Sequence, residues 1–454
     1  MLTFVRTKLK GDGIGARVIR GSALTFFGFG ASQFFRLGSN LILTRLLFPE
    51  AFGLLAIVNL YLTGLQMLSD IGLTSIIVRS KRGEDPVFLD TCWTLQVIRG
   101  LILAGITIAI AQPLSEFYEE PILNELMYGV AFSVFVMGLR STRLWTAQRN
   151  ILLGRITFLE LGCQLLSICV MIGLALVWES VWALMLGVIV AHASKAILSH
   201  FVLPGHANRF RLERAALIEQ FHFGKYLFLS SGLGFLLDSG DRVLLSKYLS
   251  LSSMGFYNIA FFFASVPTLL MGRFVQQVIF PLYSARPPGA SSENRTAISK
   301  TRFALTGSML SALFALGLIG LWLISFLYTD EYQAAGPILV ALTVSQMPSL
   351  IIQGYPILLV AEGKTGIFTA FQVFRATLQL TLTALGLVHY GLVGAIAARP
   401  LAAVLTYPVI VFLIRRYRGQ DILHDVVFAV LTVLFSAIVI WLNGDVMSLV
   451  AAIK

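Results

Sequence analysis

Apolar runs of about 20 residues recur at short intervals along this sequence, and they restrict the chain to an integral membrane fold. A helix of that length crosses the ~30 Å hydrocarbon core of a bilayer, where lipid offers irregular backbone no hydrogen-bond partner. Hydrophobic residues make up 57% of the chain and charged residues 13%, which is more apolar surface than a water-soluble domain could bury. We therefore expect one all-α membrane domain.

The apolar windows predict twelve core spans in two groups of six, followed by one extra apolar segment. The expected spans are residues 22–47, 52–78, 88–111, 122–142, 156–178, 181–203, 223–247, 255–283, 303–328, 335–361, 366–388 and 391–414, with a thirteenth run at 426–442. The expected divisions of the chain are a basic N-terminus (1–21), an N-lobe (22–203), an amphipathic linker (204–222), a C-lobe (223–414) and a C-terminal segment (415–454). The last apolar residues, 446–453, are too few to cross alone, so the side of the C-terminus stays open.

Lysine and arginine sort to alternate loops, and most of the 34 lie on the side of the N-terminus. By the positive-inside rule that side is cytoplasmic, so we expect a multi-pass membrane protein with its N-terminus in the cytoplasm. This placement accounts for the net charge of +11 without a nucleic-acid partner. The three cysteines and six histidines lack the spacing of a disulfide framework or a metal site, so we expect no metal and no catalytic residue.

Residues 43–59 align without a gap on residues 245–261, at an offset of 202 positions. Each segment contains the expected outer turn between the first two spans of its group. The alignment predicts parallel repeats related by an axis along the membrane normal, which usually meet at a central pathway. The matched pairs are Thr44 with Ser246, Arg45 with Lys247, Leu47 with Leu249 and Gly53 with Gly255.

Six arginines fall inside expected spans and away from their ends, where an ionised side chain costs ~2.5 to 3.5 kcal/mol even on the most lenient scale. Two of them lie between two amides at the spacing i, i+3, i+7, so each stripe lines one helix face. These stripes predict a wet, cationic cavity, and internal ion pairing is the alternative. The residues that we assign to substrate binding are Gln33, Arg36, Asn40, Arg273, Gln372, Arg375, Gln379 and Arg399.

Four further charged residues have two open interpretations. Asp70 is the only acid in the second expected span and could bind a coupling ion or pair with Arg36. On the seventh span Asp241 and Arg242 are adjacent and Asp238 lies one turn from Arg242, so these residues could form an internal ion pair or take part in ion coupling.

Residues 43–53 (LTRLLFPEAFG) and 68–73 (LSDIGL) resemble the signature of bacterial oligosaccharide flippases of the polysaccharide transporter family. Residues 241–245 (DRVLL), 254–260 (MGFYNIA) and 280–281 (FP) resemble the second half of that family. The family belongs to the multidrug, oligosaccharidyl-lipid and polysaccharide exporter superfamily. The resemblance implies two six-helix lobes around a central cavity and alternating access between the two sides of the membrane.

The resemblance also implies the substrate, a polyprenyl-diphosphate-linked oligosaccharide flipped to the outer leaflet for O-antigen, capsule or exopolysaccharide assembly. Membrane lipids, glycosyltransferases and a polymerase would then be the partners, and Na⁺, H⁺ or the membrane potential would drive the movement. Arg36, Asp70 and Arg273 occupy the spans in which related lipid-carrier flippases keep functional charges.

Two rival functions remain. A drug or metabolite exporter of the same fold would be expected to have acid-rich stripes for cationic drugs, whereas intramembrane arginines outnumber acids here. A membrane-embedded glycosyltransferase, polymerase or ligase would need catalytic residues on sizeable outer loops, and the outer loops expected here are short.

Overall fold

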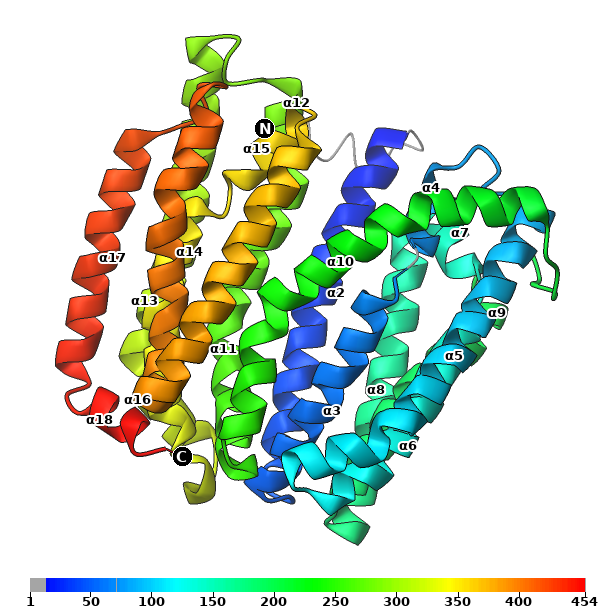
Figure 1. Cartoon of the computed structure of the whole chain (residues 1–454), viewed down its shortest axis with the longest axis horizontal. Coiled ribbons are helices and arrows are strands. Elements are labelled where there is room, and N and C mark those ends of the chain that lie inside the picture. The colour runs from blue at the N-terminus through cyan, green and yellow to red at the C-terminus, as the bar shows by residue number, and fades with distance from the viewer. Residues whose placement is uncertain (1–13, 71, 454) are drawn as a thin grey trace. The chain divides into compact units, whose positions relative to one another are not determined.

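The computed structural model describes residues 14–70 and 72–453, and all the regular structure in this part of the chain is helical (Figure 1). The predicted all-α fold is therefore confirmed. The helices of the first half are α2 (Ile14–Leu43), α3 (Pro49–Leu68), α4 (Leu73–Arg79), α5 (Pro86–Tyr118), α6 (Pro121–Gly138), α7 (Arg143–Arg149), α8 (Leu153–Trp178) and α9 (Val181–Phe201). Those of the second half are α10 (Arg214–Tyr248), α11 (Leu251–Phe274), α12 (Phe280–Ala285), α13 (Ser292–Leu327), α14 (Ala335–Ile352), α15 (Pro356–Ala361), α16 (Thr365–Arg415), α17 (Ile422–Leu442) and α18 (Val446–Ala451).

Ten helical stretches in the described residues are long and apolar enough to cross a membrane. One of them, α16, contains two expected spans: its backbone leaves the helical region at Gly391 (φ 61°, ψ −144°), a conformation that favours glycine. Gly386 and Gly394 contact each other across this bend, so α16 is a hairpin of two helices. Helices α2 and α10 have 30 and 35 residues but are not among the ten. The count of twelve core spans stays a prediction.

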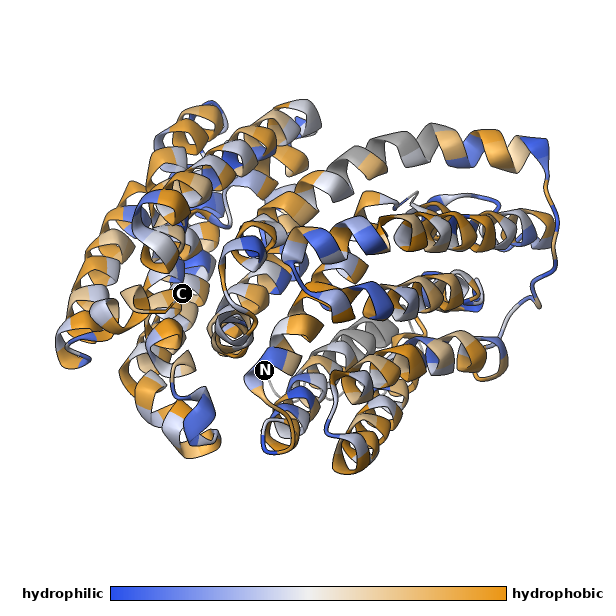
Figure 2. Ribbon diagram, turned by 60° about the horizontal axis from the view of Figure 1, so that its bottom comes forward, coloured by the Kyte–Doolittle hydropathy of each residue, from blue (hydrophilic) through white to orange (hydrophobic). Residues whose placement is uncertain are grey.

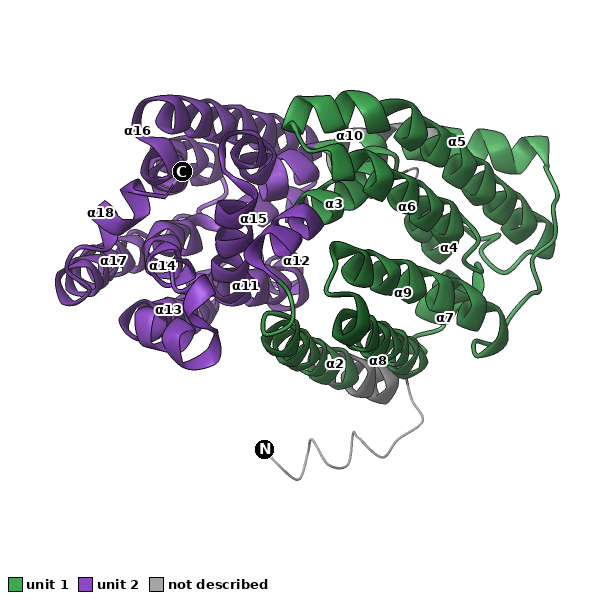
Figure 3. Ribbon diagram, turned by 90° about the horizontal axis from the view of Figure 1, so that it is seen from below, with its two compact units in different colours: residues 1–47, 57–232 green, residues 48–56, 233–454 purple. Residues whose placement is uncertain are grey.

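Hydrophobic residues dominate the helices, whereas the connection between α9 and α10 is mostly hydrophilic (Figure 2). The chain forms two compact units, residues 1–47 with 57–232 and residues 48–56 with 233–454 (Figure 3). The division falls inside α10, which is one continuous helix from Arg214. The expected linker, 204–222, is therefore an extended segment that continues as the first turns of α10.

Unit 1 contains two helical pairs, α5 with α6 and α8 with α9. Gly100 and Gly138 let the backbones of α5 and α6 approach closely, and Gln96 Nε2 donates to the carbonyl oxygens of Gly138 (2.8 Å) and Arg140 (3.0 Å) at the end of α6. Ser167 Oγ joins α8 to α9 by donating to Gly187 O (2.7 Å). Bonds of this kind hold helices together where the surrounding lipid is as apolar as the side chains.

The extended residues 204–213, which we call the strap, are fixed to α5. The backbone N–H of Arg209 donates to Asp90 Oδ1 (2.9 Å), that of Arg211 to Thr94 Oγ1 (3.0 Å) and that of Glu213 to Thr91 Oγ1 (3.1 Å). Arg82 forms ion pairs with Glu213 (2.6 Å) and Asp85 (2.5 Å), and its hydrogen bonds lower the pKa of Asp85. Three alternate backbone amides thus bind polar side chains of one helix.

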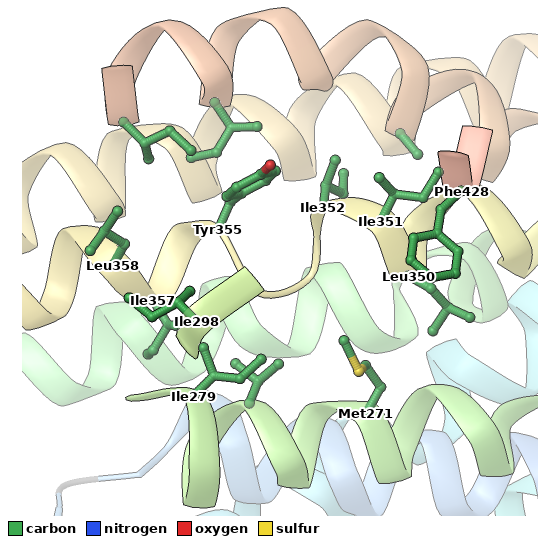
Figure 4. Close-up of a cluster of buried hydrophobic side chains, with 14 of the residues drawn as sticks. Met271, Ile279, Ile298, Leu350, Ile351, Ile352, Tyr355, Ile357, Leu358 and Phe428 are labelled. Carbon is green, nitrogen blue, oxygen red and sulfur yellow. The ribbon is translucent and has the colours of Figure 1, made fainter. Parts of the chain in front are cut away.

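Unit 2 contains a large hydrophobic cluster, which includes Met271 of α11, Leu350 of α14 and Phe428 of α17 (Figure 4). Helix α17 packs into this core, so the expected thirteenth apolar segment is confirmed as a helix. Helix α18 lies at the end of this unit away from the connection between α16 and α17 (Figure 1). Residues 284–302, which separate the expected spans 255–283 and 303–328, are largely helical because α13 begins at Ser292 with Ser291 as its N-cap.

The two repeat segments contact each other within unit 2, around Gly53 of α3 and Gly255 of α11. A Cβ on Gly53 would overlap the carbonyl oxygen of Leu251, and a Cβ on Gly255 would overlap that of Pro49. Leu251 is the repeat equivalent of Pro49, so the two contacts are reciprocal. Ser252 Oγ donates to Glu50 Oε1 (2.5 Å), and these residues are also 202 positions apart. The offset found in the sequence therefore corresponds to a pseudo-twofold contact.

Candidate substrate-binding site

In unit 2, the second part of α10 and helix α16 bring together five charged residues. These residues, which we call the charge cluster, are Asp238, Asp241, Arg242, Arg375 and Arg399. Arg399 Nη2 of α16 forms an ion pair with Asp241 Oδ2 of α10 (2.5 Å), and Asp241 is buried. Arg242 instead donates through its side chain to Ser239 Oγ (2.7 Å), and its backbone N–H donates to Asp241 Oδ1 (2.9 Å). The acid thus pairs with the distant arginine.

Two aromatic residues of α11, Tyr257 and Phe261, lie beside the charge cluster, and the sequence analysis did not assign them to the site. The Arg242 guanidinium lies 4.8 Å and that of Arg399 5.8 Å from the centroid of the Phe261 ring. Tyr257 stacks on Phe261 at 6.0 Å. Their spacing, i and i+4 on one helix face, was the available signal. Rings of this kind stabilise cations through their electron-rich faces.

Arg375 is the arginine of the charge cluster whose donors are uncommitted. It interacts electrostatically with Asp238 and Arg399, but in the described part of the chain it forms no hydrogen bond or ion pair. Gln372, one turn before Arg375, has a buried Oε1 without a partner in the described residues, and Gln379, one turn after Arg375, is buried. The cluster has three arginines and two aspartates, so it carries one excess positive charge. This arrangement suits an anion with several oxygen atoms.

The remaining stripes of unit 2 have different environments. Arg273 lies in the last turn of α11, directly before the π-helix Val275–Ile279, on which Gln276 and Gln277 are exposed. Short π-helices are frequent at functional sites. Gln346 accepts a hydrogen bond from Thr268 Oγ1, and Gln353 Nε2 donates to Thr268 O (3.3 Å). These two glutamines join α14 to α11.

In unit 1, the stripe of Gln33, Arg36 and Asn40 lies on α2. Arg36 is exposed on this unit, and the two amide residues are half-buried. The neighbouring Ser32 joins α2 to α8, because its hydroxyl donates to Gln164 Oε1 (2.7 Å) and its carbonyl accepts from Gln164 Nε2 (3.0 Å). The stripe therefore lies on α2 next to the residues through which α2 packs against α8.

Asp70 lies in a break rather than inside a continuous second span. Helix α3 ends at Leu68 and α4 begins at Leu73, and Gly72 has a positive φ of 74°. Asp70 Oδ1 accepts from Gly72 N (2.9 Å), and Oδ2 accepts from Ser231 Oγ (3.3 Å). Arg99 of α5 interacts electrostatically with Asp70 and donates to Gln66 O at the end of α3 (2.9 Å). Broken helices with a charged residue at the break commonly bind ions in transporters.

A second buried charge network in unit 2 was missed, because Arg302 was expected in a loop and Asp425 outside the thirteenth span. Arg302 is 2% exposed and Asp425 4%, and they form an ion pair between α13 and α17 (3.4 Å). The other oxygen of Asp425 accepts from Tyr355 (2.6 Å) and Tyr407 (2.8 Å). Arg302 also lies 3.8 Å from the Tyr355 ring centroid. The network anchors α17 to the core.

Comparisons with known proteins agree with this architecture. A family model described as polysaccharide biosynthesis protein matches residues 42–337. The succinoglycan biosynthesis transport protein ExoT of Rhizobium meliloti is 26% identical over 67% of this chain and 61% of its own length. The chain thus matches about three fifths of that relative. The lipopolysaccharide biosynthesis protein WzxC of Escherichia coli is 22% identical over 78% of this chain and 72% of its own length.

Two solved structures share the fold. The lipid II flippase MurJ, in an inward closed conformation, has a TM-score of 0.69 at 15% identity and covers 96% of this chain and 98% of its own. An inward-facing multidrug resistance transporter of the MATE family has a TM-score of 0.61 at 15% identity over 86% of this chain and 96% of its own. These likenesses support the fold class, and the family match covers more than half of the sequence. The chain is therefore a multi-pass membrane protein that belongs to the family of polysaccharide biosynthesis proteins.

Proposed function

We propose that this protein is a flippase that moves a polyprenyl-diphosphate-linked oligosaccharide from the cytoplasmic to the outer leaflet by alternating access. The observation that carries the proposal is Arg375, an arginine within a membrane-spanning helix whose donors no residue of the described chain occupies. A diphosphate offers several oxygen atoms to the planar fork of a guanidinium. The unpartnered Gln372 Oε1 would accept a hydrogen bond from a hydroxyl group of the first sugar.

The surrounding charge cluster supports the same ligand. Asp241 neutralises Arg399, so the cluster keeps one excess positive charge in place of two. One excess charge would attract an anion and hold it less tightly than two would. The prenyl chain would stay in lipid. The matching stripe of Arg36 in unit 1 would bind the same diphosphate group during the other half of the cycle.

The location and partners follow from this function. The protein would lie in the bacterial inner membrane with its N-terminus in the cytoplasm, and glycosyltransferases and a polymerase of the same pathway would act before and after it. A membrane potential that is negative inside would favour export of an anion by ~2.3 kcal/mol per charge per 100 mV. The proposed role is transport, and the sugar chain would leave with its covalent bonds unchanged.

The Arg375→Ala variant tests this site. We expect flipping of a labelled lipid-linked oligosaccharide in proteoliposomes to fall by roughly 10- to 100-fold, because a charged hydrogen-bonded contact is worth ~1.5 to 3 kcal/mol. Arg375→Lys should recover part of the rate, since it keeps the charge without the planar fork. Arg416→Ala, which removes an exposed arginine between α16 and α17, is the control. A wild-type rate for Arg375→Ala would contradict the proposal.

The Asp70→Asn variant tests ion coupling at the α3 break. If Asp70 binds Na⁺ or H⁺, the flipping rate of the variant should no longer depend on an imposed gradient of that ion, while its dependence on membrane potential persists. Asn keeps the side-chain oxygen that caps Gly72 N, so the break should survive. Asp445→Asn, at an exposed acid before α18, is the matched control. Unchanged gradient dependence would assign Asp70 a structural role.

A further inference from the structure

A pocket of about 940 Å³ opens in unit 1 between α5, α6 and α9, at the end where the strap crosses. Its walls are mostly apolar and include Trp93, Phe132, Val136 and Ile197. Phe132 is 52% and Ile197 58% exposed, so the pocket is open at its rim. None of these residues belongs to the charge cluster, which lies in the other unit.

The polar end of the pocket is built by Arg143 of α7. Arg143 Nε donates to His206 O (3.0 Å), and Nη1 donates to Leu203 O (3.2 Å) and to His200 O. These bonds hold the guanidinium at the C-terminal end of α9, and its second terminal nitrogen has no hydrogen bond in the described residues. A fixed cation therefore closes one end of a mostly apolar space, which His200 and Asn208 also line.

The strap adds more positive charge beside the pocket. Arg209, Arg211 and Arg214 are all exposed, although the backbone amides of the first two are bound to α5. Between them, Phe210 is 70% exposed and lies 4.7 Å from the Trp93 ring. Exposed aromatic residues alternating with arginines are typical of segments that lie at the boundary between acyl chains and headgroups. Each arginine near such a surface favours anionic lipid.

We propose that the pocket and the strap form a binding site for an anionic phospholipid of the leaflet on the basic side of the protein. One acyl chain fills the apolar space along Trp93 and Ile197. The phosphate lies between Arg143 and the exposed arginines 209 and 211. A soluble anion would leave the apolar volume empty. A zwitterionic phospholipid would bring a second cation beside its phosphate, so its net charge would not offset the three arginines. The site fixes the strap, and with it the start of α10, to the membrane surface.

Brominated phospholipids test the site, because bromine quenches the fluorescence of a tryptophan that it contacts. The full chain is reconstituted in vesicles containing either brominated phosphatidylglycerol or brominated phosphatidylcholine, and the contribution of Trp93 is taken as the difference from Trp93→Phe. We expect Trp93 to prefer phosphatidylglycerol by about tenfold or more. Arg209→Ala/Arg211→Ala should bring the preference near unity, since each arginine contributes roughly fivefold.

The matched control is Arg415→Ala/Arg416→Ala, which removes two exposed arginines from the connection after α16. It should keep the wild-type preference. Equal quenching by the two lipids in the wild type, or an equal loss in the control, would overturn the proposal. So would displacement of the brominated phosphatidylglycerol by polyprenyl diphosphate at lower concentrations than by phosphatidylglycerol, which would assign the pocket to the substrate carrier.

Discussion

Asp425→Ala is expected to lower the free energy of unfolding by ~3 to 5 kcal/mol, because it leaves the Arg302 guanidinium buried without its counter-charge. The same change removes the acceptor of two hydroxyl groups, those of Tyr355 and Tyr407. His424, which is fully buried, loses its hydrogen bond to Asp425 Oδ1 (2.9 Å). Detachment of α17 from α13 should therefore precede the unfolding of the rest of unit 2. Detergent-induced unfolding of purified protein measures the effect.

Three further variants show whether the ion pair itself is responsible. Asp445→Ala removes an exposed acid near the C-terminus and should leave stability unchanged. The double variant Arg302→Met/Asp425→Leu should recover much of the loss, because well-packed apolar residues often replace a buried ion pair at little cost. The free energy of unfolding of Asp425→Asn should lie between those of the wild type and Asp425→Ala, since asparagine keeps the shape of the side chain and one acceptor oxygen. If Asp425→Ala unfolds like Asp445→Ala, the network does not anchor α17.

The spans were predictable because each requires a long apolar window, a signal that lies within one stretch of sequence. The ends of the helices were harder to predict. Arg302 lies among charged and polar residues that read as a loop, yet α13 continues through them because Ser291 caps it and the core of unit 2 buries the arginine. The break at Asp70 was hidden for the opposite reason, since one glycine and one capping carboxylate interrupt an otherwise apolar window.

The candidate site was predictable as a set of helix faces but not as a set of partners. Spacing placed Gln372, Arg375 and Gln379 on one face, and the structure keeps them on one helix. Pairing needs tertiary structure: Asp241 adjoins Arg242 in sequence, yet its ion pair is with Arg399, 158 residues away. With Asp241 paired to Arg399, Arg375 has no hydrogen bond from the described chain. It is therefore the residue on which the proposed function depends.

Gly53→Leu and Gly255→Leu are each expected to prevent accumulation of folded protein, because both glycines lie against backbone atoms that no side-chain rotation can move. Even alanine should cost ~1 to 3 kcal/mol, as overpacking does elsewhere. The control is Gly105→Ala in α5, where a Cβ would meet nothing within 4 Å. There alanine should stabilise the helix, by up to ~1 kcal/mol. Thermal unfolding and the yield of monodisperse protein report both effects.

The pseudo-twofold contact makes a sharper prediction about the two alanine variants. Gly53 contacts Leu251 and Gly255 contacts the equivalent Pro49, so Gly53→Ala and Gly255→Ala should cost about the same. Separating α3 from α11 to admit one methyl group also opens the other contact. The double variant should therefore cost less than the sum of the two single losses, as coupled neighbours do. Additive losses would mean that each glycine packs independently, and the repeat segments would then not share one pseudo-twofold contact.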